Sequence, residues 1–225
     1  MRIKKQGIII VLLGILTVNC IDELEEAQSN YLNYNTKINL ELPFNGEWLI
    51  AHGGRNLSEN HHASVREQRF AIDAFQKING SSYLGDGKDN EDYYCFGKPL
   101  FAPGNGIVIL VENTVIDNTP GELNPNQLAG NYVVINHQND EYSFIAHFKQ
   151  GSIIVNVGDQ VVKGQKLGET GNSGNSTEPH LHYHMQTTKN LHNGEGLPAQ
   201  FLNYYANDVL IERGEPIKNQ IVKKK

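Results

Sequence analysis

The feature that most constrains this chain is a row of three histidines, His180, His182 and His184, which follows a glycine-rich run ending in Pro179. Proline and glycine disfavour a helix here, and residues two apart on a strand point to the same side of the sheet. Neutral imidazole is the commonest protein metal ligand, and zinc is a metal that it suits. The spacing therefore predicts a strand with imidazoles on one face, which are either metal ligands or part of a half-exposed polar surface.

A catalytic zinc site takes about three protein ligands and leaves one position open for water. The chain offers further ligands upstream, because His61 and His62 precede Asp73 and His147 closes the run Tyr142–His147. One aspartate and two histidines would complete such a site. The alternative is that Asp73 lies on the solvent face of a strand and that His61 and His62 are loop residues.

Motifs spread along the chain carry a family resemblance, in this order: Trp48–Gly54, Asn60–His62, Gln68–Asp73, Pro99–Gly106, Gly130–His137, His147, Val157–Gly168 and Gly171–His182. Together they resemble the lysostaphin-type zinc metallopeptidases, which cut peptide cross-links of bacterial cell wall. The resemblance covers residues 44–222. It implies an all-β fold, an antiparallel sheet or β-sandwich of the duplicated hybrid motif type, with long loops lining a zinc cleft.

The resemblance also implies roles for single residues. One zinc ion would be bound by His62, Asp73 and His182, while His147 and His180 would stand beside it without binding it. His62 fits the family's Asn-x-His pattern better than His61. The better-known members have this histidine four residues before the aspartate, whereas His62 lies eleven residues before Asp73, which resembles a subgroup with an extended loop. One imidazole can take up a water proton, and another can stabilise the oxyanion or protonate the leaving amine. The division between His147 and His180 stays open.

The other histidines have weaker patterns. His184 is either a partner of a metal ligand or a surface residue. His52 precedes Gly53 and could line the groove, but no spacing argument supports it. His137 is expected to be exposed at a strand end, and His192 lies in a polar loop.

Short Val- and Ile-rich runs separated by Gly, Asn and Asp turns predict an all-β fold without long helices. The predicted strands are Gly106–Glu112, Tyr132–Asn136, Tyr142–His147 and His180–Gln186. A hairpin is predicted over Gly158–Gln165. Two long irregular segments, residues 79–94 and 113–131, are expected to shape a substrate cleft on the rigid sheet.

The N-terminal residues 1–20 are predicted to be a signal peptide of the lipoprotein type. Three basic residues precede the apolar stretch Gly7–Val18, which is short for a membrane-spanning helix, and Cys20 follows as the residue to be acylated. Asn19 is unusual before such a cysteine, so ordinary cleavage and an uncleaved anchor remain alternatives. The chain is expected to be exported and held at a membrane, facing the periplasm or cell wall.

The expected domain organisation is a tether and leading segment over residues 21–43, a metallopeptidase domain over 44–222, and a basic tail over 223–225. Cys95 has no partner if Cys20 is acylated, which predicts a reduced or buried thiol and no disulfide. A monomer is expected.

Charge disfavours nucleic acid as a partner. Without residues 1–20 and the last three lysines, the 19 basic residues fall to 13 against 25 acidic ones, a net charge of −12. Such a domain repels phosphate polymers. The leading hypothesis is therefore an exported zinc endopeptidase acting on peptidoglycan peptides, or on another peptide that contains glycine or D-amino acids. The alternative is a non-catalytic wall-binding or activator module of the same family, and a carrier-type domain is disfavoured by the histidines.

Overall fold

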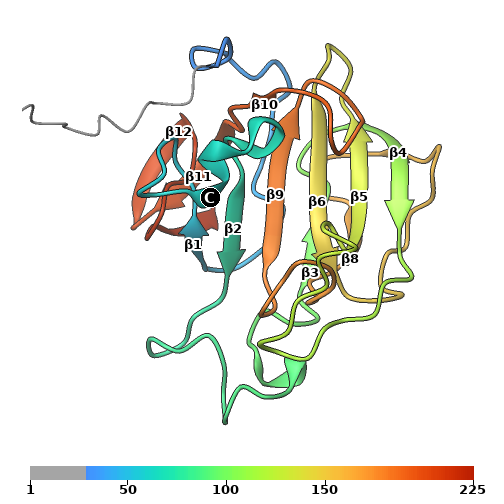
Figure 1. The fold of residues 1–225 in the computed structure, drawn as a ribbon. Coiled ribbons are helices and arrows are strands. Elements are labelled where there is room, and N and C mark those ends of the chain that lie inside the picture. The colour runs from blue at the N-terminus through green and yellow to red at the C-terminus, as the bar shows by residue number, and fades with distance from the viewer. Residues whose placement is uncertain (1–28) are drawn as a thin grey trace, which may run out of the picture.

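The computed structural model describes residues 29–225, so the predicted signal peptide and Cys20 lie outside the described part. One long sheet dominates this part (Figure 1), and its strand order is β12-β11-β13-β1-β2-β9-β6-β5-β4-β7. Every strand pair is antiparallel. The strands in this order are β1 (Trp48–His52), β2 (Ile72–Phe75), β4 (Gly106–Glu112), β5 (Asn131–Asn136), β6 (Tyr142–Phe148), β7 (Gln160–Val161), β9 (Leu181–Gln186), β11 (Phe201–Ala206), β12 (Val209–Gly214) and β13 (Ile221–Lys224). One more strand of the sheet, β10 (Gly196–Leu197), pairs with β9 outside this order.

Two further strands, β3 (Pro99–Phe101) and β8 (Lys166–Glu169), form a small second sheet. The helical turns within residues 29–225 are three short 3₁₀ helices, η1 (His61–Ser64), η2 (Arg66–Gln68) and η3 (Asn90–Asp92). The prediction of an all-β, antiparallel fold is confirmed. No helix in this part of the chain is long and apolar enough to cross a membrane.

Alternation along β9 separates the core from the candidate site. Leu181, Tyr183 and Met185 are fully buried in the hydrophobic core cluster, whereas His182 and His184 point to the opposite face of the sheet. All six residues of β9 are buried, so that opposite face is covered too. The second face is where the histidines gather.

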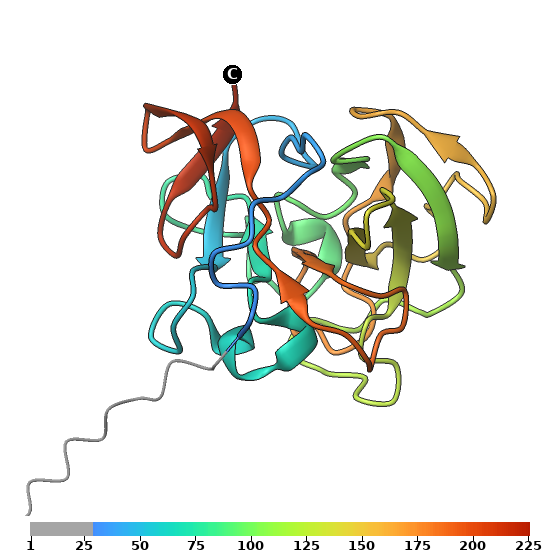
Figure 2. The same cartoon turned by 90° about the horizontal axis from the view of Figure 1, so that it is seen from above.

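The segment that leads into the domain packs closely. Thr36 donates to the carbonyl of Pro198, Leu40 bridges to Phe201, and Leu42 is 1% exposed. Figure 2 shows this segment in blue, running past the C-terminal strands. Core residues therefore precede residue 44, the expected start of the domain.

At the other end, β13 continues to Lys224 and pairs with β11. Lys223 forms ion pairs with Glu47 and Asp208. Backbone pairing therefore extends past residue 222 into most of the basic tail.

The four predicted strands are confirmed, with ends that shift by at most one residue. The predicted hairpin over Gly158–Gln165 is wrong. β7 pairs with β4, whereas β8, which follows, pairs with β3. The two strands on either side of this turn thus belong to different sheets.

The two long segments are tied together by asparagines. The Asn90 side chain donates to the Asn118 carbonyl, and Asn172 donates to both Asn90 Oδ1 and the Asn118 carbonyl. These bonds connect both loops to the glycine-rich run before β9.

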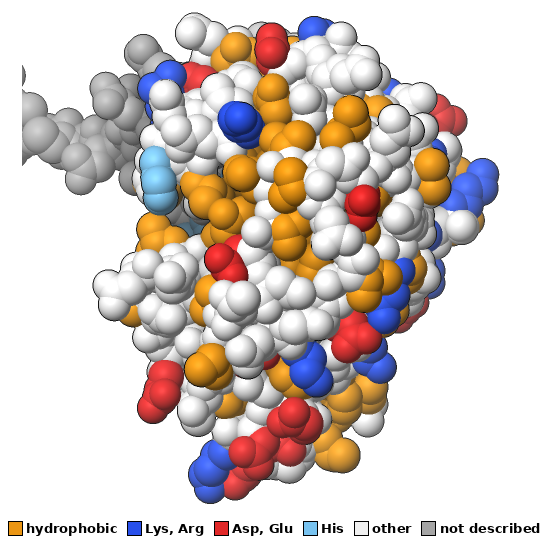
Figure 3. Space-filling view, turned by 90° about the vertical axis from the view of Figure 1, so that its right-hand side faces the viewer, with side chains coloured by type: hydrophobic (Ala, Val, Ile, Leu, Met, Phe, Trp, Pro, Cys, Tyr) orange, Lys and Arg blue, Asp and Glu red, His pale blue; other side chains and the backbone are white. Residues whose placement is uncertain are grey.

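On the side of the molecule beyond β4, hydrophobic side chains lie among uncharged polar ones, and acidic and basic groups mix at the lower end (Figure 3).

Candidate metal and proton-transfer site

Asp73 is the centre of the histidine cluster. It lies on β2, directly opposite His182 of the neighbouring strand β9. His182 Nδ1 donates to Asp73 Oδ1 at 2.9 Å, and His62 Nε2 bonds Asp73 Oδ2 at 2.9 Å. Asp73 is only 6% exposed. The solvent-face alternative for this residue is therefore wrong, and the structure brings all three residues of the expected ligand set together.

His62 comes from η1, a short turn fixed by a buried asparagine. The Asn60 side chain accepts a hydrogen bond from the His62 backbone N–H, which caps the turn. The Asn60 amide also donates to the carbonyls of Gly54 and Ala71. Since Asn60 is fully buried, these bonds join the histidine-bearing turn to the ends of β1 and β2.

His147 reaches the cluster through an irregularity in β6. The pairing with β5 matches Tyr132 with Ala146 but Asn131 with Phe148, so His147 is the extra residue, as in a β-bulge. Its φ angle is +62°, a left-handed conformation that bulges use to redirect a side chain. The ring lies 4.7 Å from the ring of His180 and 5.8 Å from that of His182.

Hydrogen bonds fix which ring nitrogen of His147 and His180 carries the proton. A carbonyl oxygen only accepts, so His147 Nδ1–H donates to the Ser173 carbonyl at 2.8 Å and His180 Nδ1–H to the Glu178 carbonyl at 2.9 Å. In the neutral rings Nε2 then holds a free lone pair. His180 Nε2 lies 3.9 Å from Asp73 Oδ1. Both rings can therefore accept a proton at Nε2.

His184 stands behind His182. Its ring is 4% exposed and stacks on Phe144 with centroids 4.7 Å apart. His184 Nδ1 and His182 Nε2 share a hydrogen bond of 2.9 Å. The surface-residue alternative for His184 is wrong, because the ring is a buried partner of His182.

The expectations for His192 and His137 have different outcomes. His192 is exposed in its loop, as expected. His137 is 6% exposed, so the expectation of an exposed ring is wrong. Its two nitrogens bond the Asn105 carbonyl at 2.6 Å and Ser143 Oγ at 2.7 Å. These bonds explain how the strand-end histidine is accommodated inside.

Glycines allow the loop that holds His147 to pack against its neighbour. Gly174 has a φ of +84°, and a Cβ added there would lie 2.3 Å from the Gly130 nitrogen. Gly130 has a φ of +59° and abuts the carbonyl group of Ser173. No other residue type fits these two positions without moving the backbone. The glycine-rich run therefore fixes the Ser173 carbonyl to which His147 donates.

Burial sets the charges of the site. Burial lowers the pKa of His147, His182 and His184, which are therefore neutral at pH 7. Burial alone would raise the pKa of Asp73, but attraction by His62 and the bonds from His182 and His62 hold it well below its usual value. The site thus combines one carboxylate with several neutral imidazoles.

This combination suits a divalent cation. The ligand atoms of His62, Asp73 and His182 all lie within 4.8 Å of one another, and the ion pairs of Asp73 in the described chain are all to histidines. A buried carboxylate without a strong positive partner is costly. Zinc accepts imidazole nitrogen and carboxylate oxygen in such sets, so these residues could hold it.

His52 belongs to the cluster but carried no spacing signal in the sequence. It is opposite Asp73 in the β1–β2 pair, after a register shift that follows Ile50. Simple alternation from Trp48 and Ile50 would place His52 in the core. The irregular residue between them turns it to the face of Asp73, and only the strand pairing reveals this.

A protein-family model matches part of the chain. The model described as peptidase family M23 matches residues 91–194. This segment contains His147, His180, His182 and His184 but begins after His62 and Asp73. The grouping of His62 and Asp73 with the other site residues therefore rests on the contacts described above.

Similar proteins include two from Vibrio cholerae. The chain is 36% identical over 89 residues to peptidoglycan DD-endopeptidase ShyA, an alignment covering 40% of this chain and 17% of that protein. It is 34% identical over 87 residues to peptidoglycan DD-endopeptidase ShyC, covering 39% and 17%. The chain thus spans about a sixth of the length of these relatives.

Two solved structures resemble the fold over part of their length. A zinc-containing peptidase from Vibrio cholerae has 22% identity and a TM-score of 0.45, over 72% of this chain and 40% of that one. The catalytic domain of lysostaphin from Staphylococcus simulans has 18% identity and a TM-score of 0.37, over 68% and 88%. The family match and the curated relatives agree with the resemblance found in the sequence, and residues 91–194 are similar to peptidase family M23.

Proposed function

We propose that this protein is an exported zinc-dependent endopeptidase that hydrolyses peptide bonds in the cross-links or stem peptides of peptidoglycan. The observation that carries the proposal is the convergence of His62, Asp73 and His182 beside two imidazoles, His147 and His180, whose Nε2 atoms are free. The names of the Vibrio cholerae relatives, peptidoglycan DD-endopeptidases, support the substrate class.

His62, Asp73 and His182 would hold one zinc ion. Bound zinc lowers the pKa of a water molecule to about 7 and polarises a carbonyl oxygen. If His182 held the metal through Nδ1, its ring proton would sit on Nε2 and would be donated to His184 Nδ1. That bond orients the ligand ring and keeps it in one tautomer.

His147 and His180 would carry protons and stabilise charge. Their Nδ1–H groups are held by the carbonyls of Ser173 and Glu178, so each presents an unprotonated Nε2. One can accept the proton of the attacking water as a general base. The other, once protonated, can stabilise the oxyanion or protonate the leaving amine. The two rings are adjacent, which allows either order of action.

A non-catalytic wall-binding or activator module is the competing function. Such a module needs no complete ligand set and no free proton acceptor. Here five side chains of the expected machinery converge on one face of the sheet. This arrangement favours catalysis.

We further propose export and membrane anchoring through Cys20. The support is the sequence alone, a basic start, the apolar stretch Gly7–Val18 and the cysteine that follows. Two acyl chains would anchor the protein stably where a single chain is marginal. Metabolic labelling with a fatty-acid analogue tests this, since the wild type should incorporate label and Cys20→Ser should not. An unlabelled wild type would refute the anchor without affecting the enzyme assignment.

Digestion of purified muropeptides by the full-length chain, followed by mass spectrometry, tests the activity. We expect new peptide termini, their loss after chelation, and their return with zinc. His182→Ala should give none, while His192→Ala, a change in an exposed loop, should cut like the wild type. A zinc-loaded wild type that leaves every muropeptide intact would instead support the non-catalytic module.

A further inference from the structure

Asp73 has a histidine opposite it on each neighbouring strand. His182 of β9 faces it on one side, and His52 of β1 faces it on the other. Directly opposed residues of an antiparallel pair have Cβ atoms about 4.5–5.5 Å apart. The carboxylate is therefore shared between two sides of the cluster, and the proposed function uses only the side of His182.

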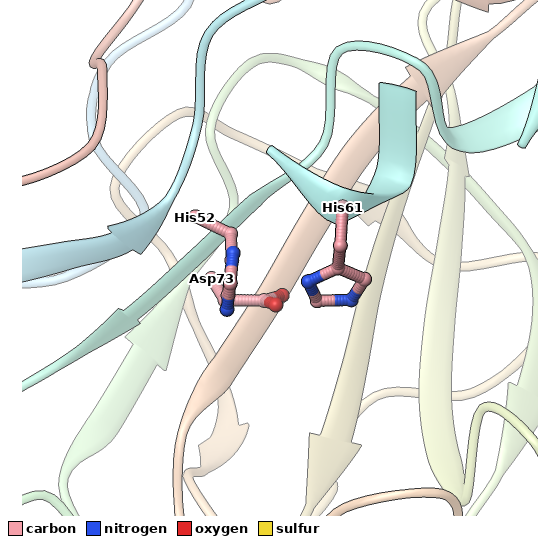
Figure 4. Close-up of side chains that lie close together, drawn as sticks. All are labelled: His52, His61 and Asp73. Carbon is pink, nitrogen blue, oxygen red and sulfur yellow. The ribbon is translucent and has the colours of Figure 1, made fainter. Parts of the chain in front are cut away.

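The second side has its own ligand from η1. His61 precedes His62 on this turn, and its ring lies 4.1 Å from the ring of His52 in an edge-on arrangement. Figure 4 shows the Asp73 carboxylate between the rings of His52 and His61. The ligand atoms of His52, His61 and Asp73 all lie within 4.8 Å of one another. Ligand atoms on one tetrahedral zinc are about 3.4 Å apart, so a small rotation would close the set.

His52 also has a ring nitrogen that is not hydrogen-bonded within the described part of the chain. Its Nδ1 atom is buried and has no hydrogen-bond partner among residues 29–225. A buried polar atom without a partner costs free energy. A cation bound at Nδ1 itself would remove this cost. His61 is exposed, so its ring is free to turn toward an ion entering from solvent.

We propose that His52, His61 and Asp73 form a second divalent-cation position, which takes zinc and is joined to the first position by the Asp73 carboxylate. Each carboxylate oxygen can serve one ion, and paired metal ions in hydrolases lie about 3.5–4 Å apart. Imidazole and carboxylate ligands suit zinc. The second ion binds more weakly than the first, because two dications repel each other and His61 is exposed. This position goes beyond the proposed function, which needs a single zinc.

Equilibrium dialysis of the metal-stripped full-length chain against buffered free zinc tests the proposal. Wild type should reach about two zinc ions per chain, in two steps. His61→Ala and His52→Ala should each lose the weaker step and keep the tighter one. His192→Ala is the matched control and should bind like the wild type, and circular dichroism checks that every variant is folded.

Replacing zinc with cobalt tests whether the two ions lie next to each other. Two Co²⁺ ions that share a carboxylate couple magnetically, so the electron paramagnetic resonance signal per ion should fall at the second equivalent in wild type. In His61→Ala the signal should rise in proportion to the tightly bound cobalt. Two uncoupled ions in the wild type would refute the bridging by Asp73.

Other outcomes separate this inference from the proposed function. A wild type that saturates at one ion overturns the second position, and so does full two-ion binding by both His52→Ala and His61→Ala. By contrast, His182→Ala should lose the tighter ion. If it binds as much zinc as wild type, the ligand set of the proposed function fails while the second position is unaffected.

Discussion

His182 and His184 share a hydrogen bond of 2.9 Å between Nε2 and Nδ1, which joins the ring beside Asp73 to a buried ring stacked on Phe144. The two histidines are two residues apart on β9 and so share a face of the sheet. The pair extends the site behind its expected metal ligand.

Replacing His184 should weaken zinc binding without removing a ligand. His184→Phe keeps the ring stacked on Phe144 but cannot accept a hydrogen bond from His182, and loss of such a partner typically costs about 10–100-fold in metal affinity. His184→Asn offers an amide oxygen as acceptor and should recover part of the loss. Competition with a chromogenic chelator measures the affinity of the tighter ion. Equal affinities for wild type and His184→Phe would contradict the positioning role.

His147 and His180 should be needed for turnover but not for zinc. His147→Asn suits the left-handed backbone at this position, since asparagine tolerates positive φ. It removes the proton acceptor, and so does His180→Asn. Each variant should turn over about 10²-fold more slowly or worse, with the tighter zinc ion retained. Metal analysis beside muropeptide kinetics tests this, and parallel loss of zinc would identify a ligand.

His137 should make the metal-free protein less stable in mild acid. Burial lowers its folded pKa below the usual 6.5. Above pH 6.5 the His137 ring is neutral in both the folded and the unfolded chain, so its burial does not lower the stability. Below 6.5 the unfolded chain takes a proton that the folded chain refuses, so stability falls until the folded pKa is reached, by at most about 1.4 kcal/mol per pH unit. Urea unfolding with chelator from pH 7 to 5 should give a smaller slope for His137→Gln. An unchanged slope would assign the effect to other groups.

Gly174 should tolerate no side chain. Gly174→Ala places a Cβ against the Gly130 backbone, whereas Gly151, with a φ of +71°, has nothing within 4 Å of its added Cβ. Gly151→Ala should cost about 1 kcal/mol from backbone strain alone. Gly174→Ala should cost about 2 kcal/mol more and reduce turnover, because the Ser173 carbonyl that holds His147 must move. Equal unfolding free energies for the two variants would show that the loop adapts.

The Cys95 thiol should be unreactive in the folded protein. It is fully buried, burial raises its pKa to about 12, and it donates to the Pro179 carbonyl. Thiolates react and thiols do not, so alkylation by iodoacetamide should be slow until urea unfolds the chain. Peptide mass mapping reports modification at Cys95 itself. Rapid modification under native conditions would mean that the turn holding Cys95 opens locally.

Local sequence patterns predicted the strands well but not their partners. β4 begins and ends where the Val- and Ile-rich run from Gly106 to Glu112 does. The hairpin over Gly158–Gln165 failed, because the local turn says nothing about whether β7 and β8 pair with each other. Pairing is decided by core burial between distant segments.

The same contrast between local pattern and strand pairing explains which histidines were predicted correctly. His182 and His184 were placed on one face by simple alternation, and both are buried there. His52 was named only as a residue that could line the groove, because no spacing argument supported it and the register shift in β1 is invisible in sequence. His137 was expected to be exposed because it lies at a strand end before a turn. Its partners, the Asn105 carbonyl and Ser143, are brought to it only by the fold.

The pairing of β2 with β9 also dictates when the site can exist. Asp73 and His182 are 109 residues apart in the chain yet directly opposed in the sheet. Such long-range pairing is slow, because a large loop must close before any contact compensates its lost entropy. A chain that has only formed its local turns holds no high-affinity zinc site, so metal capture should follow the last stage of folding. If the protein is exported as proposed, it would then acquire the ion outside the cytoplasm, after the sheet has formed.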